Sequence, residues 1–343
     1  MFKPPVIIAI AVLLAAVITL FGLQPRLHEL LRNGWSAYQT ITSPTTAAYI
    51  LLILEVVLAA LYFSSAIVLI NYHPNKRIVF VLALGFVIAG LTLPGMSDAL
   101  IKPEHSNLAD YFRVPVLSAR AVGLILQLVL FYTFPDGRFV PTWTRFLALI
   151  WAILNVLWLL NPEMAFNPIY GPTWRATPVA SFVVHTLFSV TGLLAQIYRY
   201  RRVADQVQRQ QLKWTAAAVL STSVGGAIYY GSLAFTQGMT ITPGLAATLF
   251  AYGRPLVQIV LMALIPMYCV FVAVQRYHLW QIDTIFNRTL VYGSLTLAVI
   301  VVYVVTVGAL GALFEAENGN LSISLVATGL VAVLFHPLRE RLQ

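Results

Sequence analysis

The sequence contains little charge and almost no cysteine. Its 343 residues include 21 Lys and Arg and 12 Asp and Glu, so 10% are charged, whereas soluble domains carry about 25%. Hydrophobic residues make up 59% of the chain. This composition excludes an ordinary soluble protein. The single cysteine, Cys269, excludes an internal disulfide and a cysteine-based metal cluster. The six histidines are scattered, so we expect no metal site and no cofactor.

Between short charged clusters lie apolar runs of roughly twenty residues, the length that crosses about 30 Å of hydrocarbon. The runs are continuously apolar rather than alternating, which favours helices over a barrel. The sequence therefore predicts an all-α integral membrane protein, a single polytopic domain over residues 1–343, with the lipid bilayer as its first partner. About ten spans are expected, at 4–23, 47–70, 77–94, 115–134, 144–161, 178–198, 213–235, 252–275, 289–313 and 321–336.

Ten spans place both termini on one side of the membrane, and the positive charges indicate which side. Fourteen of the 21 Lys and Arg residues lie at the two termini and in the connections after the second, fourth, sixth and eighth spans. Because Lys and Arg concentrate in cytoplasmic loops, both termini are predicted to be cytoplasmic. The net charge of +9 then reflects topology, and no nucleic-acid partner is expected.

Three segments are predicted to lie at the membrane surface. Residues 26–32 form an amphipathic turn or two in an outside loop, and 276–288 have apolar residues at helical spacing, typical of an interfacial cytoplasmic helix. The connection after the sixth span carries four Arg and one Lys, which should interact with anionic lipids. Its basic residues are Arg199, Arg201, Arg202, Arg209 and Lys213.

Four strings on the predicted cytoplasmic side carry a family resemblance. They are FPDGRF at 134–139, RQQLKW at 209–214, RYHLWQIDTIFNRTLVYG at 276–293 and LFHPLRERLQ at 334–343. In this order and spacing they resemble the multi-pass N-terminal region of bacterial sensor histidine kinases of the competence and quorum-sensing type. The resemblance covers about 115–343. Its motif residues in this chain are Phe134, Pro135, Asp136, Gly137, Arg138, Asp283, Asn287 and Arg288.

The resemblance implies a membrane sensor whose last residues, 337–343, begin a signalling helix. The chain has no phosphoacceptor box on a cytoplasmic helix and no glycine-rich ATP lid, so it is not expected to be an enzyme by itself and no catalytic residue is predicted. A homodimer and a cytoplasmic kinase or response partner are the expected protein partners. The expected ligand is a small hydrophobic or zwitterionic molecule or a peptide.

Ionisable residues inside spans are candidates for function because burying them is costly. At 1.5 Å per residue, Glu55, Arg120 and His185 lie about 12, 8 and 10 Å below the outer edge, and Arg254 begins the eighth span on the same side. One interpretation is an outward-facing ligand pocket anchored by Glu55 and Arg120. The alternative is a structural ion pair between these two residues, with His185 in a local hydrogen bond.

Two functions therefore remain open from the sequence. The first is a membrane-embedded signal-input module. The second is a small-solute transporter, although two halves with matching broken spans are not found. An integral-membrane transferase is disfavoured because Asp136, Asp205 and Asp283 are isolated from one another along the chain.

Overall fold

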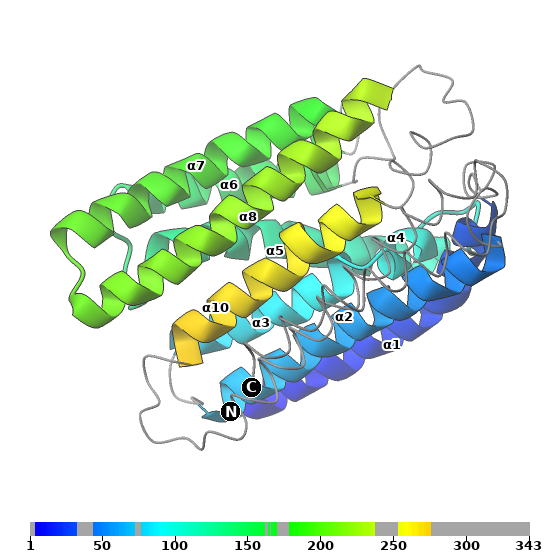
Figure 1. Ribbon diagram of the computed structural model, residues 1–343, viewed down its shortest axis with the longest axis horizontal. Coiled ribbons are helices and arrows are strands. Elements are labelled where there is room, and N and C mark those ends of the chain that lie inside the picture. Colours follow the sequence, from blue (N-terminus) through cyan, green and yellow to red (C-terminus); the bar gives the residue numbers. More distant parts are fainter. Residues whose placement is uncertain are drawn as a thin grey trace, which may run out of the picture.

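The computed structural model describes residues 4–32, 44–72, 77–161, 164, 166–169, 178–236 and 253–275, and within these ranges the only regular structure is helical (Figure 1). Apart from the five-residue α4, each helix contains a run of apolar residues that ends at polar residues, glycine or proline. The elements are α1 (Pro4–Arg32), α2 (Pro44–Tyr72), α3 (Arg77–Thr92), α4 (Met96–Leu100), α5 (Ala109–Thr133), α6 (Thr144–Leu160), α7 (Pro178–Arg202), α8 (Gln206–Thr236), the π-helix η2 (Gln258–Leu264) and α10 (Ile265–Gln275).

The first eight predicted spans each coincide with a helical segment of the structure. Among the described residues, four helical segments are long and apolar enough to cross a membrane: Pro4–Leu31, Ala48–Asn71, Ala109–Thr133 and Gly253–Val274. α3 and α6 are shorter apolar helices. Many large apolar side chains on α1 and α6 are exposed, as expected for surfaces in contact with lipid. The all-helical fold and these apolar helices indicate a multi-pass membrane protein.

The remaining predicted segments, 289–313, 321–336, the interfacial helix 276–288 and the signalling helix 337–343, lie outside the described residues.

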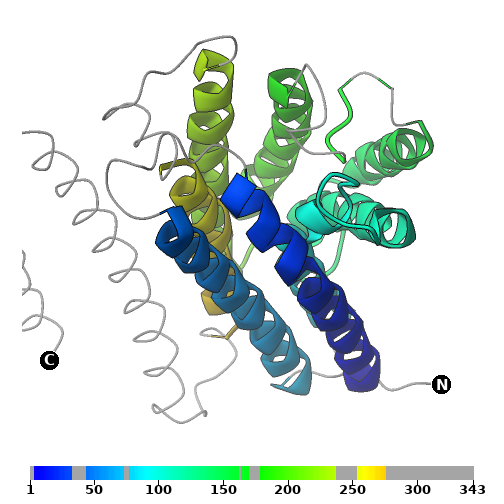
Figure 2. The same ribbon diagram turned by 90° about the vertical axis from the view of Figure 1, so that its right-hand side faces the viewer.

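Six of the elements close a ring by their side-by-side contacts. In order around the ring they are α2, α3, α5, α7, α8 and the η2–α10 segment, which returns to α2 through η2. α1 packs outside the ring against α2 and α3, and α6 packs against α5. Figures 1 and 2 show α1 and α2 lying together at one face of the bundle.

Two predictions about the connections are wrong. Residues 26–32 do not form a separate surface segment, because α1 continues through Pro25 to Arg32 and buries Glu29 in the bundle. The predicted basic connection after α7 is only three residues long, because α8 begins at Gln206, where the Asp205 carboxylate accepts a hydrogen bond from the Gln208 amide at 2.7 Å. That bond caps the first turn of α8 and moves most of the basic string into helices.

Candidate functional site

The length of α3 determines where the candidate site lies. With 16 residues α3 is about 24 Å long, shorter than the roughly 30 Å of bilayer hydrocarbon, whereas α2 has 29 residues. Glu55 lies 17 residues before the end of α2, and Gly95 lies 18 residues after the beginning of α3. The two helices run antiparallel from a short connection, so Glu55 and Gly95 come to the same level. There the Gly95 amide donates to Glu55 Oε2 at 3.1 Å.

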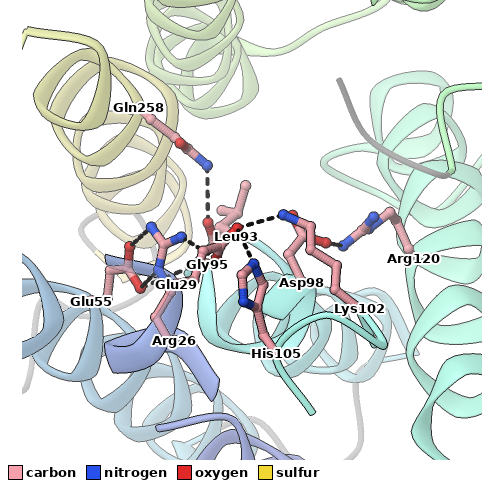
Figure 3. Close-up of polar contacts among 10 residues, drawn as sticks. All are labelled: Arg26, Glu29, Glu55, Leu93, Gly95, Asp98, Lys102, His105, Arg120 and Gln258. Atoms are coloured by element: carbon pink, nitrogen blue, oxygen red, sulfur yellow. Dashed lines mark hydrogen bonds and ion pairs between the residues drawn. The ribbon is translucent and has the colours of Figure 1, made fainter. Parts of the chain in front are cut away.

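Arg26 of α1 forms a bidentate pair with this carboxylate. Its Nε and Nη2 atoms lie 3.1 and 2.6 Å from the two Glu55 oxygens, and Glu55 is 5% exposed (Figure 3). Two parallel charge-assisted bonds fix the plane of the guanidinium as well as its position. A Cβ atom at Gly95 would lie 2.4 Å from Arg26 Cζ, so the absence of a side chain at Gly95 is what admits the guanidinium.

Glu29, one turn after Arg26, links the pair to the loop that follows α4. Arg26 Nη1 donates to Glu29 Oε2 at 2.7 Å, and Lys102 Nζ lies 2.5 Å from Glu29 Oε1. Glu29 is 7% exposed. Arg26, Glu29, Glu55 and Lys102, here called the charged network, contain two positive and two negative groups. Each charge is therefore compensated, which burial in a low-dielectric interior requires.

A second ion pair lies on the other side of α4. Asp98 of α4 forms an ion pair with Arg120 of α5, and the Arg120 Nη1 atom also donates to the Ile169 carbonyl at 2.7 Å. Figure 3 shows Asp98 and Arg120 on one side of α4 and Glu55 with Arg26 on the other. Because α4 connects the two groups of charges, a displacement of this five-residue helix alters both at once.

A hydrogen bond also links the last described helical segment to the stretch just before Gly95, the residue whose amide contacts Glu55. The side-chain Nε2 atom of Gln258, at the beginning of η2, donates to the Leu93 carbonyl at 3.1 Å. A π-helix replaces i→i+4 bonds with i→i+5 bonds and occurs frequently at functional sites. Two side chains stabilise this one: the Tyr62 hydroxyl donates to the Ala263 carbonyl at 2.9 Å, and Ser221 Oγ donates to the Leu261 carbonyl at 2.7 Å.

His105 lies at the edge of the network, in the connection between α4 and α5. Its side chain is 1% exposed, and its Nε2 atom lies 4.0 Å from Glu29 Oε1. Its Nδ1 atom has no hydrogen-bond partner among the described residues. Burial lowers the pKa of His105 below its ordinary value, and the Glu29 carboxylate only partly opposes this effect. The imidazole is therefore neutral at pH 7.

Three of the four predicted ligand-binding residues have polar partners, and no two of them share one. Glu55 and Arg120 lie near the same end of the bundle. The alternative that these two residues form an ion pair with each other is wrong, because Arg26 pairs with Glu55 and Asp98 with Arg120. Arg254 bonds to the Ser232 side chain and carbonyl at 2.9 and 2.8 Å.

His185 is the outlier among the four. It lies apart from the network contacts, with its ring 6.0 Å from that of Trp151, and its Nδ1 atom lacks a partner within the described part of the chain. The predicted local hydrogen bond is therefore absent at Nδ1.

Sequence reasoning missed the other members of the site, namely Arg26, Glu29, Asp98, Lys102 and His105. All five had been assigned to outside loops because they lie beyond the apolar runs. The useful signal was the i,i+3 spacing of Arg26 and Glu29 directly after an apolar helix, since that spacing keeps both side chains on one helical face.

The opposite end of the bundle holds another cation, Arg199, which is fully buried. Arg199 of α7 is 1% exposed, forms an ion pair with Asp136 and donates to the carbonyls of Arg138 and Tyr132. The prediction that Arg199 contacts lipid head groups is wrong, whereas Arg201 and Arg202 are exposed. We call Arg199 and its three acceptors the arginine clamp.

The clamp holds the family-like turn at 134–139. Gly137 has φ of +81°, a value that glycine adopts without steric cost, and its amide donates to the Thr133 carbonyl at 2.8 Å. The other motif residues, Asp283, Asn287 and Arg288, lie outside the described residues.

No family model, curated protein or solved structure matches the chain. Among the residues that the structure describes, no group of three or more His, Cys, Asp or Glu side chains is placed to hold a metal ion.

Proposed function

We propose that this chain is a membrane-embedded signal-input module. In this proposal it crosses a bacterial inner membrane about ten times, has both termini in the cytoplasm and lacks catalytic activity of its own. The charged network faces the outside, and the arginine clamp faces the cytoplasm. The output partner is a histidine kinase or response protein, in line with the four family-like strings, and the module acts as a homodimer.

One observation carries the proposal. Gln258 bonds the η2–α10 segment to the carbonyl of Leu93, two residues before the Gly95 amide that contacts Glu55. This segment leads at Gln275 directly into the longest family-like string. When a π-helical segment changes its hydrogen-bond register from i→i+5 to the i→i+4 pattern of an α-helix, the residues that follow are rotated and translated. A change in the network thus has a physical route toward the C-terminal part of the chain.

The charge distribution also favours a sensor over the alternative, a small-solute transporter. Transporters hold substrate near the bilayer midplane between broken helices of two related halves. Here the network charges compensate one another and tie α1, α2 and the α4 region together near one end of the bundle. Such an arrangement suits a conformational switch more than a solute path.

A flux assay tests this choice. The purified chain is reconstituted in proteoliposomes with a pH gradient and a membrane potential, and uptake is measured for radiolabelled amino acids, sugars and protons. We expect rates equal to those of protein-free liposomes. Uptake above that background that is lost in the Glu55→Gln variant would favour the transporter and contradict the proposal.

A further inference from the structure

We propose that neutral His105 helps to hold the 101–108 loop against the charged network, a closed arrangement called here the latch. Acidification outside protonates His105 and opens the latch. The latch itself depends only on contacts within the fold. The inference that acidification is the stimulus of the module rests on the proposed function.

The loop is held closed by a small number of contacts. Lys102 bonds to Glu29 at 2.5 Å, and the side chain of His105 is enclosed between the loop and α1. The backbone amides of His105 and Ser106 both donate to the Lys102 carbonyl, at 3.0 and 3.1 Å. The lysine thus organises the loop backbone while its ammonium group attaches the loop to α1.

Protonation of His105 conflicts with this closed arrangement. An imidazolium has two N–H donors, and the buried Nδ1 atom has no acceptor among the described residues. The second donor, Nε2, faces Glu29 Oε1, the same oxygen that Lys102 already occupies. A second cation at this oxygen competes with Lys102, so binding of the proton is easier once the loop has opened and the ring is in water.

The charges around His105 come from two segments. Glu29 and His28 face it from α1, with the His28 ring 5.8 Å away, and Lys102 and Glu104 face it from its own loop. Glu29 and Glu104 favour the proton, whereas burial, Lys102 and His28 oppose it, and burial is the largest effect. The closed loop therefore prefers neutral His105, and its stability falls as the pH drops below the ordinary histidine value of about 6.5.

Opening of the loop has a defined consequence for the fold. Lys102 directly follows the turn after α4, and α4 carries Asp98, the partner of Arg120. Release of Lys102 leaves Glu29 bonded to Arg26 alone and frees the loop end of α4. The proton signal would then reach both sides of α4 without any bound organic ligand.

Hydrogen–deuterium exchange of the full chain in nanodiscs tests the latch. Uptake by peptides that cover 101–108 is compared at pH 7.5 and pH 5.5 after correction for the intrinsic pH dependence of exchange. When loop opening is coupled to the binding of one proton, its equilibrium constant rises up to tenfold per pH unit below the ordinary pKa. We therefore expect this constant to be about tenfold larger at pH 5.5 than at pH 7.5. His105→Phe keeps the aromatic ring, removes titration and should abolish the increase.

His28→Phe is the matched control, since His28 is an exposed histidine in contact with His105, and this variant should retain the increase. His105→Gln serves as the second variant if the phenylalanine does not fold. A wild-type protein without a pH-dependent increase, or a His105 variant that keeps it, overturns the latch. The flux assay is independent of these outcomes, so failure of the latch and failure of the signal-input function are distinguishable.

Discussion

Replacement of Glu55 by leucine is expected to lower the free energy of unfolding by about 3–5 kcal/mol. The reason is that Arg26 then keeps only one of its two carboxylate partners, Glu29. Glu55 is 5% exposed, accepts both bonds of the bidentate Arg26 pair and also accepts the Gly95 amide. The measurement is unfolding by SDS titration in mixed micelles, followed by circular dichroism.

A double variant separates loss of a pair from loss of packing. Arg26→Met combined with Glu55→Leu removes both charges and keeps apolar volume, so much of the stability lost in Glu55→Leu alone should return. Asp110→Asn is the control for an exposed carboxylate at the beginning of α5 and should change stability by less than about 0.5 kcal/mol. Equal losses in Glu55→Leu and Asp110→Asn would contradict the buried network.

Replacement of Arg199 by leucine is expected to have an effect of similar size, about 3–5 kcal/mol, because Asp136 and two backbone carbonyls lose their shared donor. Arg199→Lys should recover only part of the loss, since an ammonium lacks the planar fork that reaches several acceptors at once. The same SDS titration measures both variants.

Arg201, two residues later on α7, is the matched control for Arg199. It is exposed, and Arg201→Leu should leave the free energy of unfolding within about 0.5 kcal/mol of the wild-type value. If the two arginines proved equivalent, the arginine clamp would be wrong, and the basic string would act only through lipid.

The sequence predicts the helices well and their polar contacts poorly, for a physical reason. Apolar runs locate helices because every helix in lipid must be apolar over its length, and each of the first eight runs is helical in the structure. The depth of Glu55 and Arg120 follows from the rise per residue. Their partners do not, because depth leaves the azimuth of a side chain undetermined, and both partners come from residues beyond the apolar runs.

The treatment of charged residues as membrane boundaries caused the remaining errors. Arg26 and Glu29 lie after the first apolar run and were assigned to a loop, although compensation of charge allows α1 to continue through them. Arg199 was grouped with its exposed neighbours, although the Asp136 carboxylate and two backbone carbonyls hold this one arginine in a buried position. Neither outcome is visible in hydropathy, since both depend on contacts between distant segments.

The central claim is that the charged network is coupled to the segment that leads to the C-terminal part of the chain. Its most direct test is hydrogen–deuterium exchange of the Gln258→Leu variant in nanodiscs, because this change removes the bond to the Leu93 carbonyl without altering any charge. We predict altered exchange in α10, at the far end of its segment, and unchanged exchange in α6, which packs against α5. Altered exchange limited to residues 93–100, with α10 as in the wild type, would contradict the claim.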